Sequence, residues 1–307
     1  MKNLIKRVLF GEISLREYIA IQQEEHDFQE KAYLKTKDSL LDITEAHWLL
    51  CLEPFVFGVW VKEKEKIEEG CSLLFKHRKG EGLALSAKLE LLYWDEIGLE
   101  EGTLLLFRTK PGSVRIGNIL RMVFLFYGYY RNPKMSYSKF KLLSAAFSFP
   151  RRVRLVSFKQ EEFATLFPMD LLGEIPGTNT YVLGLRHTNQ AVSKMVETQK
   201  VVVCEVSAEH KEMLYVLGKH HAEKFPSLEE LSFQTFPSMK FGFLLPEWVS
   251  SYKELTIRQW KDLGSQMLFL GEVENQMVLR RDKGNLYHIH FLYYFLQKRK
   301  GMLFHEI

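Results

Sequence analysis

Two short runs in the second half of the chain decide the prediction of the fold: residues 181–186 read YVLGLR and residues 201–206 read VVVCEV. Each is a run of strand length made almost entirely of apolar residues, which is typical of a buried strand. Between them, Ala191, Met195 and Val196 recur at the spacing of one helical face, so the sequence predicts a short helix there. A strand, a short helix and a second strand place this segment inside a β-rich domain.

Further runs of strand length lie on both sides of this segment. Residues 153–158 read VRLVSF and alternate apolar side chains with Arg and Ser, as a half-buried strand does. An apolar piece follows over residues 163–173, and two more runs cover residues 267–273 and 286–294. The second half of the chain is therefore predicted to be mainly β.

The first 150 residues are predicted to form an N-terminal α+β region, whose role the sequence does not show. In the first fifty residues apolar side chains recur at about helical spacing, which predicts helix. From Trp48 onward the apolar runs are of strand length, and they predict strands over residues 48–52, 55–61, 71–75, 83–92 and 103–107. The boundary to residues 151–307 is placed near Pro150, because a residue that precedes proline is pushed out of the helical region.

In their order, the pieces of the second half resemble the flavin reductase-like branch of the FMN-binding split-barrel family. The resemblance covers about residues 153–294 and rests on the order and spacing of several short pieces. Residues 223–225 (EKF) and 271–273 (GEV) are similar to two further family segments. The resemblance implies an α+β, mainly β protein: a C-terminal split β-barrel with an N-terminal helical and β extension or domain.

The resemblance also implies which residues would hold the flavin. The piece from Phe167 to Gly173 stands where relatives run a strand past the flavin ring and phosphate. Arg186 supplies a planar cation suited to phosphate, and the helix start that follows supplies free N–H donors. The implied cofactor-binding residues are Pro168, Met169, Asp170, Leu171, Gly173, Arg186, His187, Thr188, Asn189 and Lys224. For Arg186 and Thr188 a purely structural role, an ion pair and a helix cap, is the open alternative.

The function that the resemblance implies is that of an NAD(P)H-dependent flavin oxidoreductase. Hydride would pass from a reduced nicotinamide to FMN, or to FAD in its place, and the protein would supply position and electrostatics. No catalytic residue is predicted, because the cofactor does the chemistry. Relatives of this kind bind flavin between two subunits, so the implied assembly is a homodimer.

Three departures from the family pattern keep a second function open. Asp170 and Glu174 stand where relatives offer hydroxyl groups to the flavin phosphate, and Gln266 stands where many relatives carry a histidine. Carboxylates are poor neighbours for a phosphate dianion. The alternative is a split-barrel binding or accessory protein without catalytic turnover.

Residues 110–159 form a basic, aromatic segment. They hold eleven Lys or Arg, ten Phe or Tyr and no Asp or Glu, while the whole chain has a net charge of +4. The remainder therefore sums to −7, which is +4 minus 11. The cations must face water, acidic surface elsewhere in the fold or an anionic partner. A nucleic-acid-binding surface is the sharper interpretation, and a connecting segment paired with the acidic remainder is the plainer one.

Composition also bears on the cellular compartment, on membrane association and on metal binding. Cys51, Cys71 and Cys204 show no metal-ligand spacing and would leave one thiol unpaired in an oxidising compartment, so a reducing, cytoplasmic setting is expected. Neither an export signal nor a run long enough to span a bilayer is recognised. His288 and His290 lie on one face of a predicted strand, but no third ligand stands at a fixed spacing, so no metal site is predicted.

Overall fold

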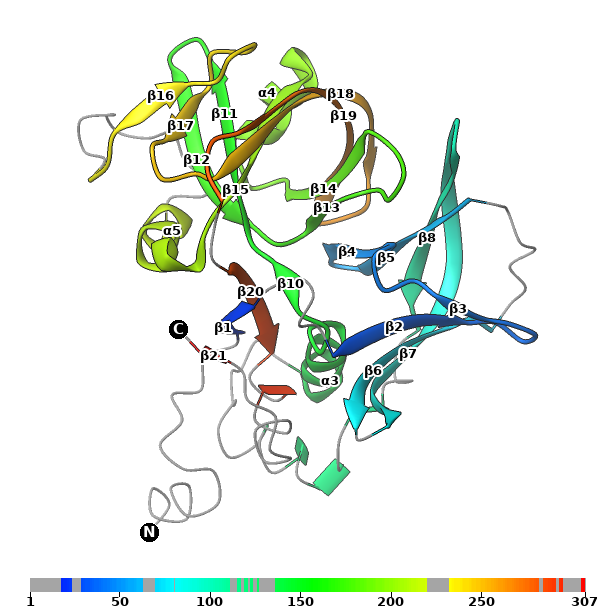
Figure 1. The fold of residues 1–307 in the computed structure, drawn as a ribbon. Coiled ribbons are helices and arrows are strands. Elements are labelled where there is room, and N and C mark those ends of the chain that lie inside the picture. The colour runs from blue at the N-terminus through cyan, green and yellow to red at the C-terminus, as the bar shows by residue number, and fades with distance from the viewer. Residues whose placement is uncertain are drawn as a thin grey trace.

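The fold is mainly β, as predicted, and consists of two large sheets joined by a small third one (Figure 1). The structure is a computed structural model. It describes residues 18–23, 29–62, 70–79, 81–110, 115–116, 119–120, 122–123, 126, 136–219, 232–281, 284–290, 293–294 and 305–306.

The second half of the chain forms a curled half-barrel of seven antiparallel strands, at the top of Figure 1. Strand β14 (Thr180–Arg186), helix α4 (Ala191–Thr198) and strand β15 (Lys200–Glu205) confirm the prediction of a strand, a short helix and a second strand. In spatial order the strands are β12 (Phe163–Met169), β11 (Arg154–Gln160), β15 (Lys200–Glu205), β18 (Ser251–Asp262), β19 (Gln266–Val278), β14 (Thr180–Arg186) and β13 (Leu172–Glu174). The helices of this half are α4 (Ala191–Thr198), α5 (Lys211–Lys219) and the short η2 (Ala208–His210), and the hairpin β16 (Thr235–Pro237) and β17 (Leu244–Pro246) lies beside the barrel.

The first half of the chain forms a second antiparallel sheet, at the right of Figure 1. Its predicted strands from Trp48 onward are all present. In spatial order they are β3 (Leu40–Asp42), β2 (Glu30–Lys35), β6 (Ser72–Lys79), β7 (Gly82–Leu99), β8 (Gly102–Thr109), β5 (Phe55–Val61) and β4 (His47–Leu52), and β9 (Arg115–Ile116) pairs with β7 off this path. We call this body the N-terminal sheet.

The prediction of helix in the first fifty residues is wrong for the part that the structure describes. Strands β1 (Tyr18–Gln23), β2 and β3 occupy it, and residues 1–17 lie outside the described residues. In β2 the buried residues Glu30, Ala32 and Leu34 alternate with more exposed ones, which is the period of a strand. Antiparallel pairing with β6 satisfies the backbone of β2, so the tertiary pairing overrides the weak helical spacing.

A small sheet joins the two bodies. It contains β10 (Arg151–Arg152), β20 (Asn285–His290), β1 and β21 (His305–Glu306) in that order, and helix α3 (Tyr137–Ala146) precedes it. Ser136 begins α3, because its side chain accepts a hydrogen bond from the Lys139 N–H. Strand β1 comes from the first half of the chain and β20 from the second, so their pairing joins residues on both sides of the boundary predicted near Pro150.

Strand β4 of the N-terminal sheet lies directly on the half-barrel, and two glycines allow this close approach. A Cβ added to Gly184 of β14 would lie 2.0 Å from the Leu50 carbonyl oxygen, and one added to Gly173 of β13 would lie 1.9 Å from Trp48 Nε1. Only glycine fits where two backbones or a backbone and an indole approach this closely. One hydrophobic core accordingly contains residues of both bodies.

None of the described helices has the length and apolar character that crossing a bilayer requires. Cys51, Cys71 and Cys204 are buried, and none of the three forms a disulfide bond.

Candidate functional site

A cavity of about 770 Å³ lies between the half-barrel and the N-terminal sheet. This volume is within the usual range of small-molecule sites. Three kinds of side chain line it. The cations are Lys31, Arg151, Arg152, Arg154 and Lys253, the carboxylates are Glu30, Glu45, Asp170, Glu174 and Glu205, and the ring-bearing residues are His47, Trp48, Phe57, Phe75, Phe149, Tyr181 and Tyr287. A site with this lining suits a ligand that is partly aromatic and partly charged.

The half-barrel side of the cavity carries an ion-paired network. Arg154 Nε lies 2.6 Å from one oxygen of Glu205, and Arg152 Nε lies 2.9 Å from the other. Burial favours the neutral form of Glu205, but the charges of Arg154 and Arg152 outweigh it and hold the pKa of Glu205 below its ordinary value. Beside them, Lys253 Nζ lies 2.5 Å from Glu174 Oε2. The cations of this wall are thus partly neutralised by the protein itself.

Asp170 connects the cavity to a chain of hydrogen bonds. His288 Nδ1 lies 3.1 Å from Asp170 Oδ2, and His288 Nε2 lies 3.0 Å from the Tyr215 hydroxyl. Because a carboxylate can only accept, His288 donates from Nδ1, and its neutral form then accepts from Tyr215 at Nε2. Burial would raise the pKa of Asp170, but the bond from His288 and the charge of Arg151 lower it. Asp170 is therefore an ionised and already partnered carboxylate.

His47 projects into the cavity from the start of β4. Its Nδ1 lies 2.8 Å from the Ile43 carbonyl oxygen, so Nδ1 carries the proton. The His47 ring contacts Phe149 at 4.7 Å and Phe75 at 5.6 Å between centroids. Burial, together with the charge of Arg151, lowers the pKa of His47 to about 4. His47 is therefore a neutral imidazole at physiological pH.

Glu30, on β2, is another titratable residue that lines the cavity together with His47. Its side chain is 2% exposed, and the Tyr293 hydroxyl donates to its Oε1 at 2.6 Å. Its Oε2 is buried and has no hydrogen-bond partner among the described residues. Burial raises the pKa of Glu30 above its ordinary value, although the bond from Tyr293 opposes the shift. The structure thus favours a neutral carboxyl group here.

The structure divides the residues that the sequence implied for flavin binding into two groups. In the first group, Asp170 and Gly173 line the cavity, whereas Met169 and Leu171 are buried in the core. Pro168 is half-buried on β12. Gly173 faces the Trp48 indole, so its backbone is covered by the N-terminal sheet. Only part of this segment can therefore reach a ligand in the cavity.

The second group lies at the C-terminal end of β14 and in the turn that follows it. Arg186, His187 and Thr188 are exposed there, and His187 Nε2 lies 3.3 Å from Asp262 Oδ1. Asn189 is buried and accepts a hydrogen bond from the Ala191 N–H at 2.9 Å, so it caps α4. None of these four residues lines the cavity, although the Gly184 N–H donates to the Leu171 carbonyl oxygen only two residues before Arg186. Lys224 lies outside the described residues.

Gln266 has a structural role that the sequence did not suggest. It is 0% exposed, and its Oε1 accepts from Cys51 Sγ and from the Leu52 N–H, each at 3.0 Å. Both partners belong to β4, so Gln266 fastens the N-terminal sheet to the half-barrel. The position at which relatives carry a histidine is filled here by a contact between the two halves of the chain.

The sequence analysis missed Glu30 and His47 as cavity residues. One local signal existed for Glu30, because a charged residue stands in phase with the buried Ala32 and Leu34 on β2. No local signal existed for His47, whose partners come from elements distant in the sequence. Arg151, Arg152 and Arg154 were noted in the basic segment, but their convergence on a cavity was not predicted.

Several cations of the basic segment 110–159 pair with acidic residues elsewhere in the fold. Arg152 and Arg154 bind Glu205, and Lys139 binds Glu53. The Lys141 ammonium group lies over the Tyr137 ring. The plainer interpretation of the segment therefore holds for these residues, while Arg121, Arg131 and Lys134 lie outside the described residues.

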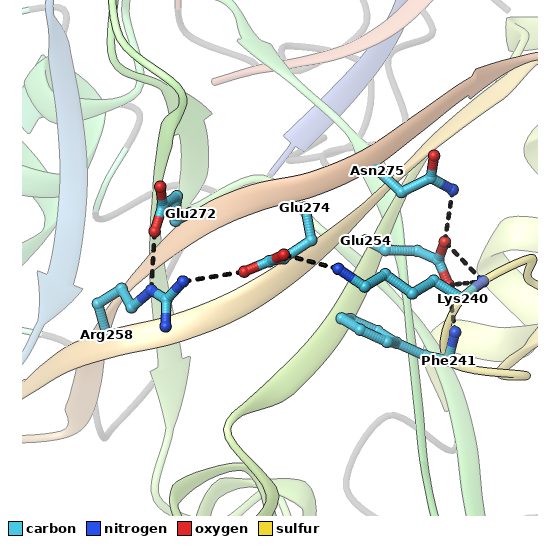
Figure 2. A network of polar contacts seen from close by, with 7 residues as sticks. All are labelled: Lys240, Phe241, Glu254, Arg258, Glu272, Glu274 and Asn275. Carbon is cyan, nitrogen blue, oxygen red and sulfur yellow. Dashed lines mark hydrogen bonds and ion pairs between the residues drawn. The ribbon is translucent and has the colours of Figure 1, made fainter.

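A second polar network lies on β18 and β19, and none of its members lines the cavity (Figure 2). Its centre is Glu254, which is 0% exposed and accepts from Ser238 Oγ, Asn275 Nδ2 and the backbone N–H groups of Lys240 and Phe241. These donors hold the segment from Ser238 to Phe243 against the barrel. Among the described residues, no group of three or more His, Cys, Asp or Glu could hold a metal ion.

Comparison with known proteins finds similarity in structure alone. No protein-family model matches the chain, and no curated protein matches it. Among solved structures, the flavin reductase component of a bacterial two-component tryptophan halogenase is 13% identical, with 48% of this chain and 91% of that chain covered and a TM-score of 0.43. The Streptomyces globisporus NADH:FAD oxidoreductase is 16% identical, with 51% and 90% covered and a TM-score of 0.43.

An FMN-binding protein from Thermus thermophilus is 14% identical, with 42% of this chain and 73% of that chain covered and a TM-score of 0.38. About half of the chain is thus similar in fold to flavin reductases and to an FMN-binding protein. At such identities and TM-scores the similarity carries no argument about ligand or reaction.

Proposed function

We propose that this protein binds a flavin nucleotide, FMN in the first place, in the cavity between its two halves and acts as a flavin-dependent oxidoreductase. The observation that carries the proposal is the lining of that cavity, which combines aromatic rings with guanidinium and ammonium groups in about 770 Å³. A flavin nucleotide is a planar aromatic ring system that carries a phosphate. Both parts find suitable partners in the same cavity.

The residues present fit such a group. Phe75, Phe149 and His47 form a set of mutually contacting rings, with Phe75 and Phe149 centroids 5.6 Å apart, against which a planar ligand can pack. Lys31 and Arg151 add positive charge to this lining, which favours an anionic group in the cavity, and the Arg151 guanidinium stacks on the Phe147 ring. Arg151 also influences the titration of Asp170, His47 and His290, so its charge reaches several sides of the cavity.

The protein's part in the reaction would be to bind, orient and exclude water. A bound flavin supplies hydride chemistry, with NADH or NADPH as the proposed reductant. Because Glu174 and Glu205 are paired with cations and Asp170 lies in the field of the Arg151 charge, their negative charges are compensated towards an anionic ligand. The carboxylates that departed from the family pattern are therefore compatible with a phosphate nearby.

Cofactor binding through the end of β14, at Arg186, His187, Thr188 and Asn189, stays a prediction from the resemblance. Homodimer formation also stays a prediction, which light scattering of the purified protein at micromolar concentration tests. The proposed setting is the cytoplasm, with which three buried cysteines that form no disulfide bond are compatible.

The test of the proposed function is an absorbance spectrum of the purified protein, taken alone, with added FMN or FAD, and then with NADH or NADPH under anaerobic conditions. The expected result is a protein-bound flavin band near ~450 nm that bleaches when the nicotinamide is added. A flavin that binds but does not bleach would instead support a binding protein without turnover. A protein that leaves the spectra of both flavins unchanged would refute the proposal.

A further inference from the structure

We propose that His47 accepts a hydrogen bond from a ring N–H of the cavity's ligand, so that the cavity selects planar heterocycles with an imide-type edge. Such an edge has a ring N–H flanked by carbonyl groups. This inference rests on the proposed function and deepens it, because the flavin ring carries one such edge, at its N3–H and adjoining carbonyls.

The orientation of His47 is fixed by the chain around it. The Ile43 N–H donates to Ala32 of β2 at 2.9 Å, and the Ile43 carbonyl in turn accepts from His47 Nδ1. Hydrogen bonds thus connect the turn between β3 and β4 to strand β2, and connect His47 to the same turn. Contacts with Phe75 and Phe149 restrict rotation of the ring. A side chain held at both its polar and its apolar sides is preorganised for recognition.

The tautomer follows from this anchoring. With Nδ1 donating to Ile43, the neutral ring offers its lone pair at Nε2. No described residue forms a hydrogen bond with Nε2, and His47 lines the cavity. The only polar atom that the ring has left to offer a ligand is therefore an acceptor, and its natural complement is an N–H donor.

The register of the sheet makes Glu30 a neighbour of the same aromatic ring as His47. Ala32 of β2 pairs with Phe75 of β6, and Glu30 pairs with His77, so Glu30 is the diagonal neighbour of Phe75 on the same face. His47 contacts Phe75 as well. Glu30 and His47 are therefore both neighbours of Phe75 in the lining of the cavity.

Glu30 differs from His47 in what it can offer a ligand. Tyr293 donates to Oε1 of Glu30, and Oε2 is covered by the surrounding residues. His47 lines the cavity, and its Nε2 forms no hydrogen bond with a described residue. The acceptor of His47 is therefore the atom that the N–H of a ligand can meet.

The charged groups around His47 keep it neutral over the pH range in which the protein would work. Arg151 of β10 disfavours its protonation, while Asp42 of β3 and the carbonyls of Ile43 and Thr44 favour it more weakly than burial opposes it. Recognition of the N–H is therefore expected to be constant from about pH 8 down to about pH 5. It should be lost only below pH 4, where His47 becomes a donor.

The experiment compares two probes, FMN and its N3-methyl derivative, by quenching of flavin fluorescence with wild-type protein and with His47→Phe. The methyl group removes the ring N–H, and phenylalanine keeps the aromatic packing but removes the acceptor. Wild-type protein is expected to bind FMN about tenfold more tightly than N3-methyl-FMN, the size of one hydrogen bond with a buried partner. His47→Phe is expected to bind both with equal affinity, and His47→Gln, whose amide oxygen can replace Nε2, to restore the preference for FMN.

The outcomes distinguish failure of this inference from failure of the proposed function. Wild-type protein that binds both probes equally, or a His47→Phe variant that keeps the preference, would overturn this inference and leave the proposed function intact. Wild-type protein that binds neither probe would overturn the proposed function and this inference with it. The comparison of the two probes on wild-type protein needs no variant, so a His47→Phe protein that fails to fold does not remove the test.

Discussion

Two buried glutamates of this protein differ in almost everything except burial. Glu254, at the centre of the network in Figure 2, accepts hydrogen bonds from four residues, and these bonds hold its pKa below the ordinary value although burial opposes the shift. Glu30 accepts one side-chain bond, from Tyr293, and burial holds its pKa above the ordinary value. The hydrogen bonds to Glu254 hold the fold together, whereas Oε2 of Glu30 forms no hydrogen bond with a described residue.

The difference indicates how to separate structural charge from functional charge within a single structure. Glu254 satisfies the backbone N–H groups of a loop, and its neighbours Lys240, Arg258, Glu272 and Glu274 complete a chain of ion pairs on the surface of β18 and β19. Glu30 lines a cavity together with His47, whose Nε2 has no bond from a described residue. Unused hydrogen-bonding capacity next to a cavity favours a ligand.

The largest effect is expected from Glu254→Ala, which would leave the N–H groups of Lys240 and Phe241 and the amide of Asn275 without their acceptor. The expected loss is about 3 kcal/mol in the free energy of unfolding, because several buried donors become unsatisfied together. Urea denaturation measures it. Glu272→Ala, which removes an exposed partner of Arg258, is the matched control and should cost less than ~1 kcal/mol. Equal effects of the two variants would refute the contrast.

A second effect concerns the stability of the protein in acid. Burial, with the charge of Arg151, lowers the pKa of His290 to about 3, well below the 6.5 of an unperturbed histidine. As pH falls below about 6.5, His290 becomes protonated in the unfolded chain but stays neutral in the folded protein. The free energy of unfolding therefore decreases as pH falls, by about 1.4 kcal/mol per pH unit for such a group. His290→Phe should therefore flatten the dependence of unfolding free energy on pH between 6 and 4.5. An unchanged slope would show that His290 is protonated in the folded protein.

The smallest effect is expected from Glu30→Gln, an isosteric and neutral substitution. Because the pKa of Glu30 is raised by folding, its contribution to stability is present at low pH and is lost as pH rises through the folded value. Glu30→Gln should be close to wild type in stability at pH 5 and more stable than wild type at pH 8. Urea denaturation at the two pH values measures this. Destabilisation at pH 8 would mean that an ionised Glu30 has a partner of its own.

The sequence predicted the strands better than their assembly. β5, β14 and β15 were predicted within one residue at each end, because each is a compact apolar run. The helix expected in the first fifty residues failed because the period-two burial of β2 is set by pairing with β6, about forty residues away. Local spacing could not reveal that pairing.

The candidate site depends on contacts between distant parts of the chain, which a single sequence does not show. His47 and Arg151 are about one hundred residues apart and meet only because β4 and β10 border the same cavity. Gln266 was interpreted as a lost active-site residue, although its amide oxygen binds β4 of the N-terminal sheet. Recognition of Gly173 and Gly184 as points of close approach required the partner strand as well.

The central claim is that the flavin binds in the cavity between the two halves of the chain, and an equilibrium titration with FMN tests it most directly. The titration uses wild-type protein, Arg151→Gln, which removes a cation from the cavity, and Arg186→Gln, which removes one from the C-terminal end of β14. Thermal unfolding of each variant without ligand controls for loss of fold.

The account predicts that Arg151→Gln weakens FMN binding at least about tenfold, because it removes a positive charge beside the cavity, while Arg186→Gln changes it by less than about twofold. The reverse order would contradict the account and place the flavin at the end of β14, where the resemblance to flavin reductases implied it. Wild-type protein that binds no FMN would contradict both placements.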